Sequence, residues 1–251
     1  SQLDDCVAQG AQAIVLGAIS ADGVNAKVEE IVGKGIPVID FVNGINTPKV
    51  SAHALVSFYD MGHNIGEYMK ENYVSGGDKI QVAFFPGPQG AGWTDTAYQG
   101  FLDATKDSPI EVVATKWGDT GREIQLKLVE DTLQSNPEVD YIVGNAQAAV
   151  AAVQAVREAG IDDHVKVIAF HQNPPVYDGI AAGDILAASN DSTVIQGRMA
   201  VDMAVRLLEG QTLPTNRSGP IITTMTPDNL KDFVWESTFA PKDFKPVFTV
   251  Q

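Results

Sequence analysis

The stretch AIVLGAISADGVNAKVEEIVGKGIPVIDFV, residues 13–42, decides the fold class. An apolar run at 13–17 is typical of a buried strand, helical periodicity follows from Asp22 to Gly33, and a second apolar run occupies 36–42 after a break at Gly35. Strand, helix and strand in this order predict a parallel βαβ unit. Its strands are apolar throughout because helices cover both faces of such a sheet.

The same alternation continues along the chain. Further strands are expected at 54–56, 80–85, 110–115, 141–144, 167–170 and 185–188, and further helices at 59–73, 93–106, 121–133, 147–158 and 194–208. Gly76-Gly77-Asp78 interrupts the chain between two such series. We therefore expect an α/β fold of two doubly wound parallel-sheet lobes joined by a hinge.

Three short crossings would connect these lobes. We expect them near Gly76–Gly77, Asn190–Asp191 and Gly219–Pro220. The N-terminal lobe then comprises residues 1–77 plus 191–219, and the C-terminal lobe comprises 78–190 plus 220–251.

The first lobe starts inside a helix, because Leu3, Val7 and Ala11 have helical spacing and run directly into the strand at 13–17. A βαβ unit occupies roughly 30 residues or more. We expect that the N-terminal strand, helix and strand of this lobe are missing from the chain. A natural four-stranded lobe is the alternative.

Composition restricts the classes of partner. The 251 residues are 44% hydrophobic, enough for two lobes, and 32 acidic residues against 17 basic ones give a net charge of -15. So negative a surface repels nucleic acid and anionic lipid. Since there is no run of about 20 apolar residues and no signal peptide, we expect a soluble chain without membrane insertion, whose export signal has been removed or lies upstream.

Motifs for catalysis or cofactors are absent from the sequence. It contains no phosphate-binding, dinucleotide, nucleophile-elbow or zinc-protease motif. The four histidines are far apart, and Cys6, expected to be a buried helical thiol, is the only cysteine. We therefore expect a protein that is not an enzyme and has neither cofactor nor metal.

Several segments resemble the type I periplasmic binding proteins, the superfamily of the ribose-binding proteins, and in particular its TorT-like branch. They are Val38–Asn43, Pro86–Gly92, Glu138–Gly144 and Ala187–Asp191, and collinear similarity extends from Gln2 to Val247. The resemblance implies a periplasmic protein that holds a small ligand between its lobes and contacts a membrane histidine kinase. In this branch it also implies a ligand similar to trimethylamine N-oxide, or another small polar molecule.

Ligand-binding candidates follow the predicted strands, where open α/β sheets bind their ligands. Trp93 could stack on a sugar or a cation, and Asn145 offers a donor and an acceptor. The alternatives are a packed helix-start residue for Trp93 and a helix N-cap for Asn145. Asp95 is a candidate or an exposed first-turn carboxylate, and His171 is a candidate or a histidine in a loop stiffened by two prolines.

Four weaker candidates complete the set. Asp191 either contacts the ligand or braces the hinge, whereas Phe58, Asn43 and Ser20 follow first-lobe strands, and Phe58 could equally belong to the core. The resemblance implies an aromatic cage with Trp and Tyr where this chain has Phe58 and His171, and a small residue where it has Trp93. A changed cage predicts a changed ligand.

Two other functions of the same fold remain open. A transport receptor would deliver a sugar or polyol to an ABC permease, and a LacI-type effector-binding core would regulate transcription. The acidity of the chain weighs against the repressor core, because that class binds DNA.

Overall fold

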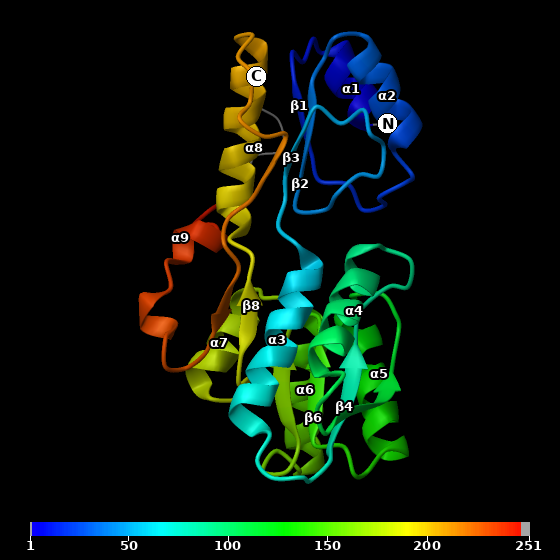
Figure 1. Ribbon diagram of the computed structural model, residues 1–251, viewed down its shortest axis with the longest axis vertical. Helices are drawn as coiled ribbons and strands as arrows, with labels where there is room; N and C mark the ends of the chain where they lie inside the picture. Colours follow the sequence, from blue (N-terminus) through cyan, green and yellow to red (C-terminus); the bar gives the residue numbers. More distant parts are fainter. Residues whose placement is uncertain (1, 247–251) are drawn as a thin grey trace.

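The computed structural model describes residues 2–246, so the last five residues of the expected second lobe lie outside the described residues. Figure 1 shows two α/β lobes, one above the other, each built around its own sheet. This confirms the predicted fold class. Within residues 2–246, no helix is long and apolar enough to cross a bilayer.

The first lobe contains a parallel sheet in the order β1-β2-β3-β9. These strands are β1 (Ile14–Leu16), β2 (Val38–Phe41), β3 (Ala52–Ala54) and β9 (Arg217–Ser218). Helices α1 (Gln2–Ala8) and α2 (Asn25–Gly33) pack around Val38, whereas α8 (Thr193–Leu208) packs on Ile39, which points to the other face. Cys6 on α1 is exposed, so the prediction of a buried thiol is wrong.

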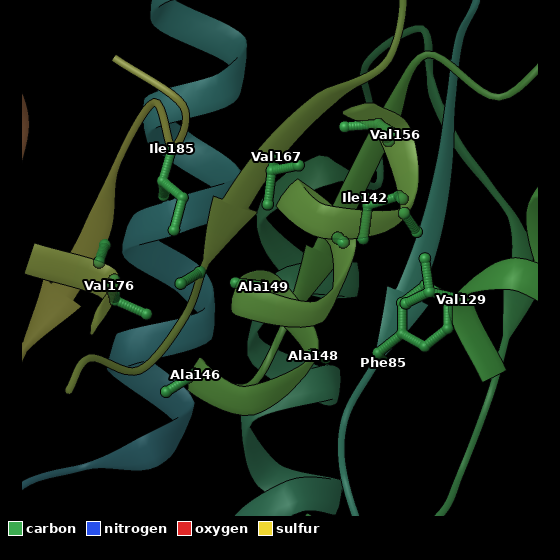
Figure 2. Packing of buried hydrophobic residues seen from close by; sticks show 14 of the residues in the cluster. Phe85, Val129, Ile142, Ala146, Ala148, Ala149, Val156, Val167, Val176 and Ile185 are labelled. Atoms are coloured by element: carbon green, nitrogen blue, oxygen red, sulfur yellow. The ribbon is translucent and has the colours of Figure 1, made fainter. Parts of the chain in front are cut away.

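The second lobe contains a sheet in the order β10-β8-β7-β6-β4-β5. Its strands are β4 (Ile80–Phe85), β5 (Ile110–Thr115), β6 (Tyr141–Gly144), β7 (Lys166–Ala169), β8 (Ala188–Asn190) and the antiparallel β10 (Thr223–Met225). Helices α5 (Arg122–Ser135), α6 (Ala146–Ala159) and α7 (Pro174–Ala182) cover one face. In Figure 2 the small alanines of α6, such as Ala148 and Ala149, lie among Phe85, Ile142 and Val167 of the strands.

The other face of this sheet is covered by α3 (Phe58–Tyr73) and α4 (Trp93–Thr105). Ile65 and Met69 of α3 are fully buried with Phe84 and Phe101, in the core of the second lobe. The expected limit at residue 77 assigns α3 to the first lobe, which this packing contradicts. We propose that the first crossing lies before α3, near Ser57.

Two of the chain segments between the lobes lie close to one another. β9 pairs with β3 of the first sheet, whereas β10 pairs with β8 of the second, so the chain crosses between residues 218 and 223. The Leu55 amide donates to the Ser218 carbonyl at 3.0 Å. A Cβ atom on Gly219 would lie 2.1 Å from the Leu55 carbonyl oxygen, so only glycine permits this approach. The short η1 (Leu230–Asp232) and α9 (Trp235–Thr238) follow.

Candidate functional site

A cavity of about 490 Å³ lies between the lobes, where the carboxyl ends of both sheets meet. Asn43 follows β2 in the first lobe, and Asn145 and His171 follow β6 and β7 in the second. Both lobes therefore contribute to one cavity, as open α/β sheets predict. It is lined by Ile19, Val42, Asn43, Phe58, Pro88, Ala91, Trp93, Asp119, Thr120, Asn145, Ala146, Gln147, His171 and Asn173.

Three rings form an aromatic wall. Phe58 is the first residue of α3 and Trp93 the first of α4, and their ring centroids are 5.7 Å apart at an angle of 45°. The His171 ring lies 6.3 Å from Phe58. Phe58 and Trp93 also pack against the core of the second lobe, so the alternative core assignment holds together with the cavity lining. Tilted rings of this kind present π-faces to an apolar or cationic group.

Glycines set the distance between α3 and α4, and therefore between Phe58 and Trp93. A Cβ atom on Gly62 would lie 1.9 Å from the Ala97 carbonyl oxygen, and one on Gly100 would lie 2.0 Å from the Tyr59 carbonyl oxygen. Either contact is far inside van der Waals distance, so the backbones approach only because both positions lack a side chain. The aromatic wall thus depends on glycines one turn or more inside each helix.

Two amide side chains line the cavity from opposite lobes. Asn145 is buried, its Oδ1 accepts hydrogen bonds from the Gln147 and Ala148 amides, and its Nδ2 donates to the Phe85 carbonyl. The expected N-cap role is therefore present, and one Nδ2 hydrogen remains for another acceptor. Asn43 donates from Nδ2 to the Ala18 carbonyl at 2.9 Å, which leaves its Oδ1 as an acceptor.

Asp191 is fully buried behind His171 and is not among the cavity-lining residues of the described chain. Its Oδ1 accepts from Gln172 Nε2 at 3.1 Å and from Thr193 Oγ1 at 2.9 Å, and His171 Nε2 lies 3.7 Å from its Oδ2. Burial by itself raises the pKa of Asp191, but His171 and these donors outweigh it and hold the pKa below its ordinary value. The carboxylate ties the loop after β7 to the start of α8, which favours the hinge-bracing alternative.

Asp95 and Ser20 do not line this cavity in the described part of the chain. Asp95 is exposed in the first turn of α4, which is the predicted alternative. Ser20 is also exposed, and its Oγ accepts from the Gly23 amide at 3.0 Å, closing the turn before α2. A ligand contact stays a prediction for both residues.

Sequence reasoning missed several lining residues. Val42 has a φ of +63°, a strained conformation for a β-branched residue, and lies where β2 ends. Asp119, Thr120, Gln147 and Asn173 lie in loops or at helix starts beside the predicted candidates. Asn173 caps α7 by accepting from the Val176 amide, a signal that Asn-Pro-Pro carries in the sequence. The expected rigid loop at Pro174 is instead the start of that helix.

Comparisons with known proteins agree with this architecture. Residues 1–212 match the family model of the periplasmic binding protein domain. The chain is 33% identical to the periplasmic protein TorT of Escherichia coli K12 over 251 residues, which is all of this chain and 71% of TorT. The described residues 2–246 contain no group of three or more His, Cys, Asp or Glu side chains that could hold a metal ion.

Two solved structures are also similar. An ABC transporter solute binding protein from Bradyrhizobium sp. BTAi1 with bound bis-tris is 48% identical, with a TM-score of 0.87, and the match covers 99% of this chain and 74% of that one. The complex of the TorS sensor domain with TorT in the presence of TMAO is 30% identical, with a TM-score of 0.89, and the match covers 99% and 83%. The chain therefore belongs to the periplasmic binding protein family and is TorT-like.

Proposed function

We propose that this protein is a periplasmic receptor that closes over a small polar ligand and, when closed, engages the sensor domain of a membrane histidine kinase. The observation that carries the proposal is the cavity lined by Asn43 of one lobe and by Trp93, Asn145 and His171 of the other. A ligand that touches both walls binds the closed form more tightly than the open form. Ligand binding then shifts the population toward closure.

The kinase partner is supported by the likeness to TorT, which forms a complex with the TorS sensor domain. The ligand class is supported by the wall chemistry. Phe58 and Trp93 suit methyl groups or a cation, whereas the amides of Asn43 and Asn145 suit a polar oxygen or hydroxyl. Trimethylamine N-oxide has both features, and so do betaines and small hydroxylated amines. The cage differences at Phe58, Trp93 and His171 favour a ligand other than trimethylamine N-oxide itself.

A thermal-shift screen of amine oxides, betaines, sugars and polyols tests this function. Ligand that binds only the folded state at a hundred times Kd stabilises it by about 2.7 kcal/mol, a shift of several degrees in Tm. Trp93→Ala should lose most of that shift, whereas Trp235→Phe, which does not line the cavity, should keep it. A best compound that stabilises Trp93→Ala as strongly as the parent contradicts the cavity assignment.

The alternative function is a sugar or polyol receptor of an ABC transporter. The similarity to the Bradyrhizobium solute binding protein, which comes from an ABC transporter, favours it. The two functions share the cavity and differ in the partner of the closed form. Ligand-dependent binding to a purified kinase sensor domain supports the sensor function, and ligand-dependent stimulation of a reconstituted permease supports the transport function.

A further inference from the structure

A second cavity of about 330 Å³ adjoins the first. Six residues line both, which places the second cavity directly beside the aromatic wall: Ile19, Val42, Asn43, Phe58, Ala91 and Trp93. Its other walls come from the loop after β2, from β3 and the chain that follows it, from the start of α4, and from β9. We call it the Arg217 compartment, after the arginine that lines it.

Three side chains form a row beneath this compartment. Asp40, His53 and Arg217 are in register on β2, β3 and β9, so they project from the same face of the sheet. His53 Nδ1 lies 2.8 Å from Asp40 Oδ1, and Asp40 Oδ2 accepts from the Ile45 amide at 2.8 Å. The buried carboxylate is therefore occupied by donors of its own lobe. Because Asp40 holds Nδ1 of His53, the other ring nitrogen of His53 is the one left to contact a ligand in the compartment.

Arg217 has no ion pair with any carboxylate among residues 2–246. Arg122 and Arg198 also lack such a pair among these residues, so what distinguishes Arg217 is its place in the wall of the compartment. No Asp or Glu lines the Arg217 compartment in the described chain, and its only basic linings are Arg217 and His53. A guanidinium with free donors facing a cavity suits planar recognition of a carboxylate.

The helices add to this positive potential. Both α3 and α4 begin at the compartment, with Phe58 and Trp93 as their first residues, so the positive ends of two helix dipoles lie there. The acidic residues of those first turns, Asp60 and Asp95, are exposed and do not line the compartment in the described structure. The arginine and both helix ends thus favour the same sign of ligand charge.

We propose that the Arg217 compartment binds a carboxylate group of the same ligand whose apolar or cationic part lies against Phe58 and Trp93. This inference rests on the proposed function and narrows its ligand class to small carboxylates, zwitterions included. Asn43, which lines both cavities, lies where the two parts of such a ligand join.

Calorimetry on matched ligand pairs tests the proposal. Glycine betaine is compared with choline, and 3-hydroxybutyrate with 1,3-butanediol, so that each pair differs in the carboxylate. In every pair that binds, the acid should bind more tightly than its alcohol, and Arg217→Gln should weaken binding of the acid roughly ten-fold, the loss of one charge-assisted contact. Arg198→Gln, an exposed arginine of α8 outside both cavities, should leave Kd unchanged. An alcohol that binds as tightly as its acid, or an acid that binds Arg217→Gln as tightly as the parent, overturns the proposal.

A second measurement needs no ligand. Trp93 is one of three tryptophans, so Trp117→Phe/Trp235→Phe leaves it as the sole indole reporter. Iodide, an anion, should quench its fluorescence about two-fold less when Arg217→Gln is added, because the local anion concentration falls with the potential. Neutral acrylamide should quench both proteins equally. Equal iodide quenching overturns the proposal even if no compound of the panel binds.

The two variants distinguish a failure of the carboxylate site from a failure of the proposed function. If Trp93→Ala abolishes ligand binding and Arg217→Gln does not affect it, the carboxylate site is wrong and the interlobe cavity stands. If the ligand binds equally to Trp93→Ala, the proposed function itself is wrong.

Discussion

Gly62→Ala tests whether close packing of α3 on α4 builds the aromatic wall. The new Cβ would lie 1.9 Å from the Ala97 carbonyl oxygen, whereas ordinary contact begins at 3.4 Å. The helices would have to separate by about 1.5 Å at this point. Overpacking of this size costs about 1–3 kcal/mol, and alanine regains up to about 1 kcal/mol of helix propensity. We expect a net loss of about 1–2 kcal/mol.

Urea unfolding followed by circular dichroism measures this loss. Gly33→Ala at the end of α2 is the matched control, because its Cβ would meet nothing within 4 Å and should stabilise the protein by about 0.5 kcal/mol. Gly62→Ala should also weaken ligand binding, since separating the helices moves Phe58 away from Trp93. If Gly62→Ala is as stable as Gly33→Ala and binds ligand normally, glycine packing does not position the wall.

Three further variants test the surroundings of the cavity. Asp191→Asn should lower the free energy of unfolding at pH 7. Because the pKa of Asp191 in the folded protein lies below its ordinary value of 3.8, the stabilisation by the carboxylate is complete well above pH 3.8 and is lost as the pH falls through the folded pKa. The stabilities of parent and variant should therefore converge in acid. A constant difference down to pH 2 would contradict this. Asn145→Ala should cost about 1 kcal/mol in urea unfolding and Asn145→Ser much less, because serine also caps a helix; equal losses would exclude the cap as the cause. Val42→Gly should keep or raise Tm, since it relieves a left-handed conformation that costs about 1–2 kcal/mol, and should weaken ligand binding. A clear fall in its Tm would show that the valine is not strained.

The sequence predicts most strands and helices of both lobes, because apolar runs and helical periods are local signals, but not α7, β9 and β10. It also predicts that Asn43, Asn145 and His171 meet, since each follows a parallel strand and such strand ends share one edge. The predictions that differ from the structure concern features that depend on tertiary contacts. β8 begins at Ala188, three residues after the expected start at Ile185, although Leu186 and Ala187 already hydrogen-bond to β7 through the Val167 carbonyl and the Ala169 amide.

The lobe limit and two site residues could not be read from local patterns. The turn at Gly76 is real, but α3 before it buries Ile65 in the second lobe, and only the packing of the whole chain reveals this. Ser20 and Asp95 occupy the expected strand and helix ends, yet their side chains serve a turn and solvent. His53 and Arg217 gave no sequence signal, because their register across β3 and β9 joins residues 164 positions apart.

Small-angle X-ray scattering, with and without the compound that raises Tm most, tests directly whether one ligand joins the two lobes. The radius of gyration should fall when the compound is added, and should not change for Trp93→Ala at the same concentration. A compound that raises Tm through Trp93 while the scattering curve stays unchanged would contradict closure.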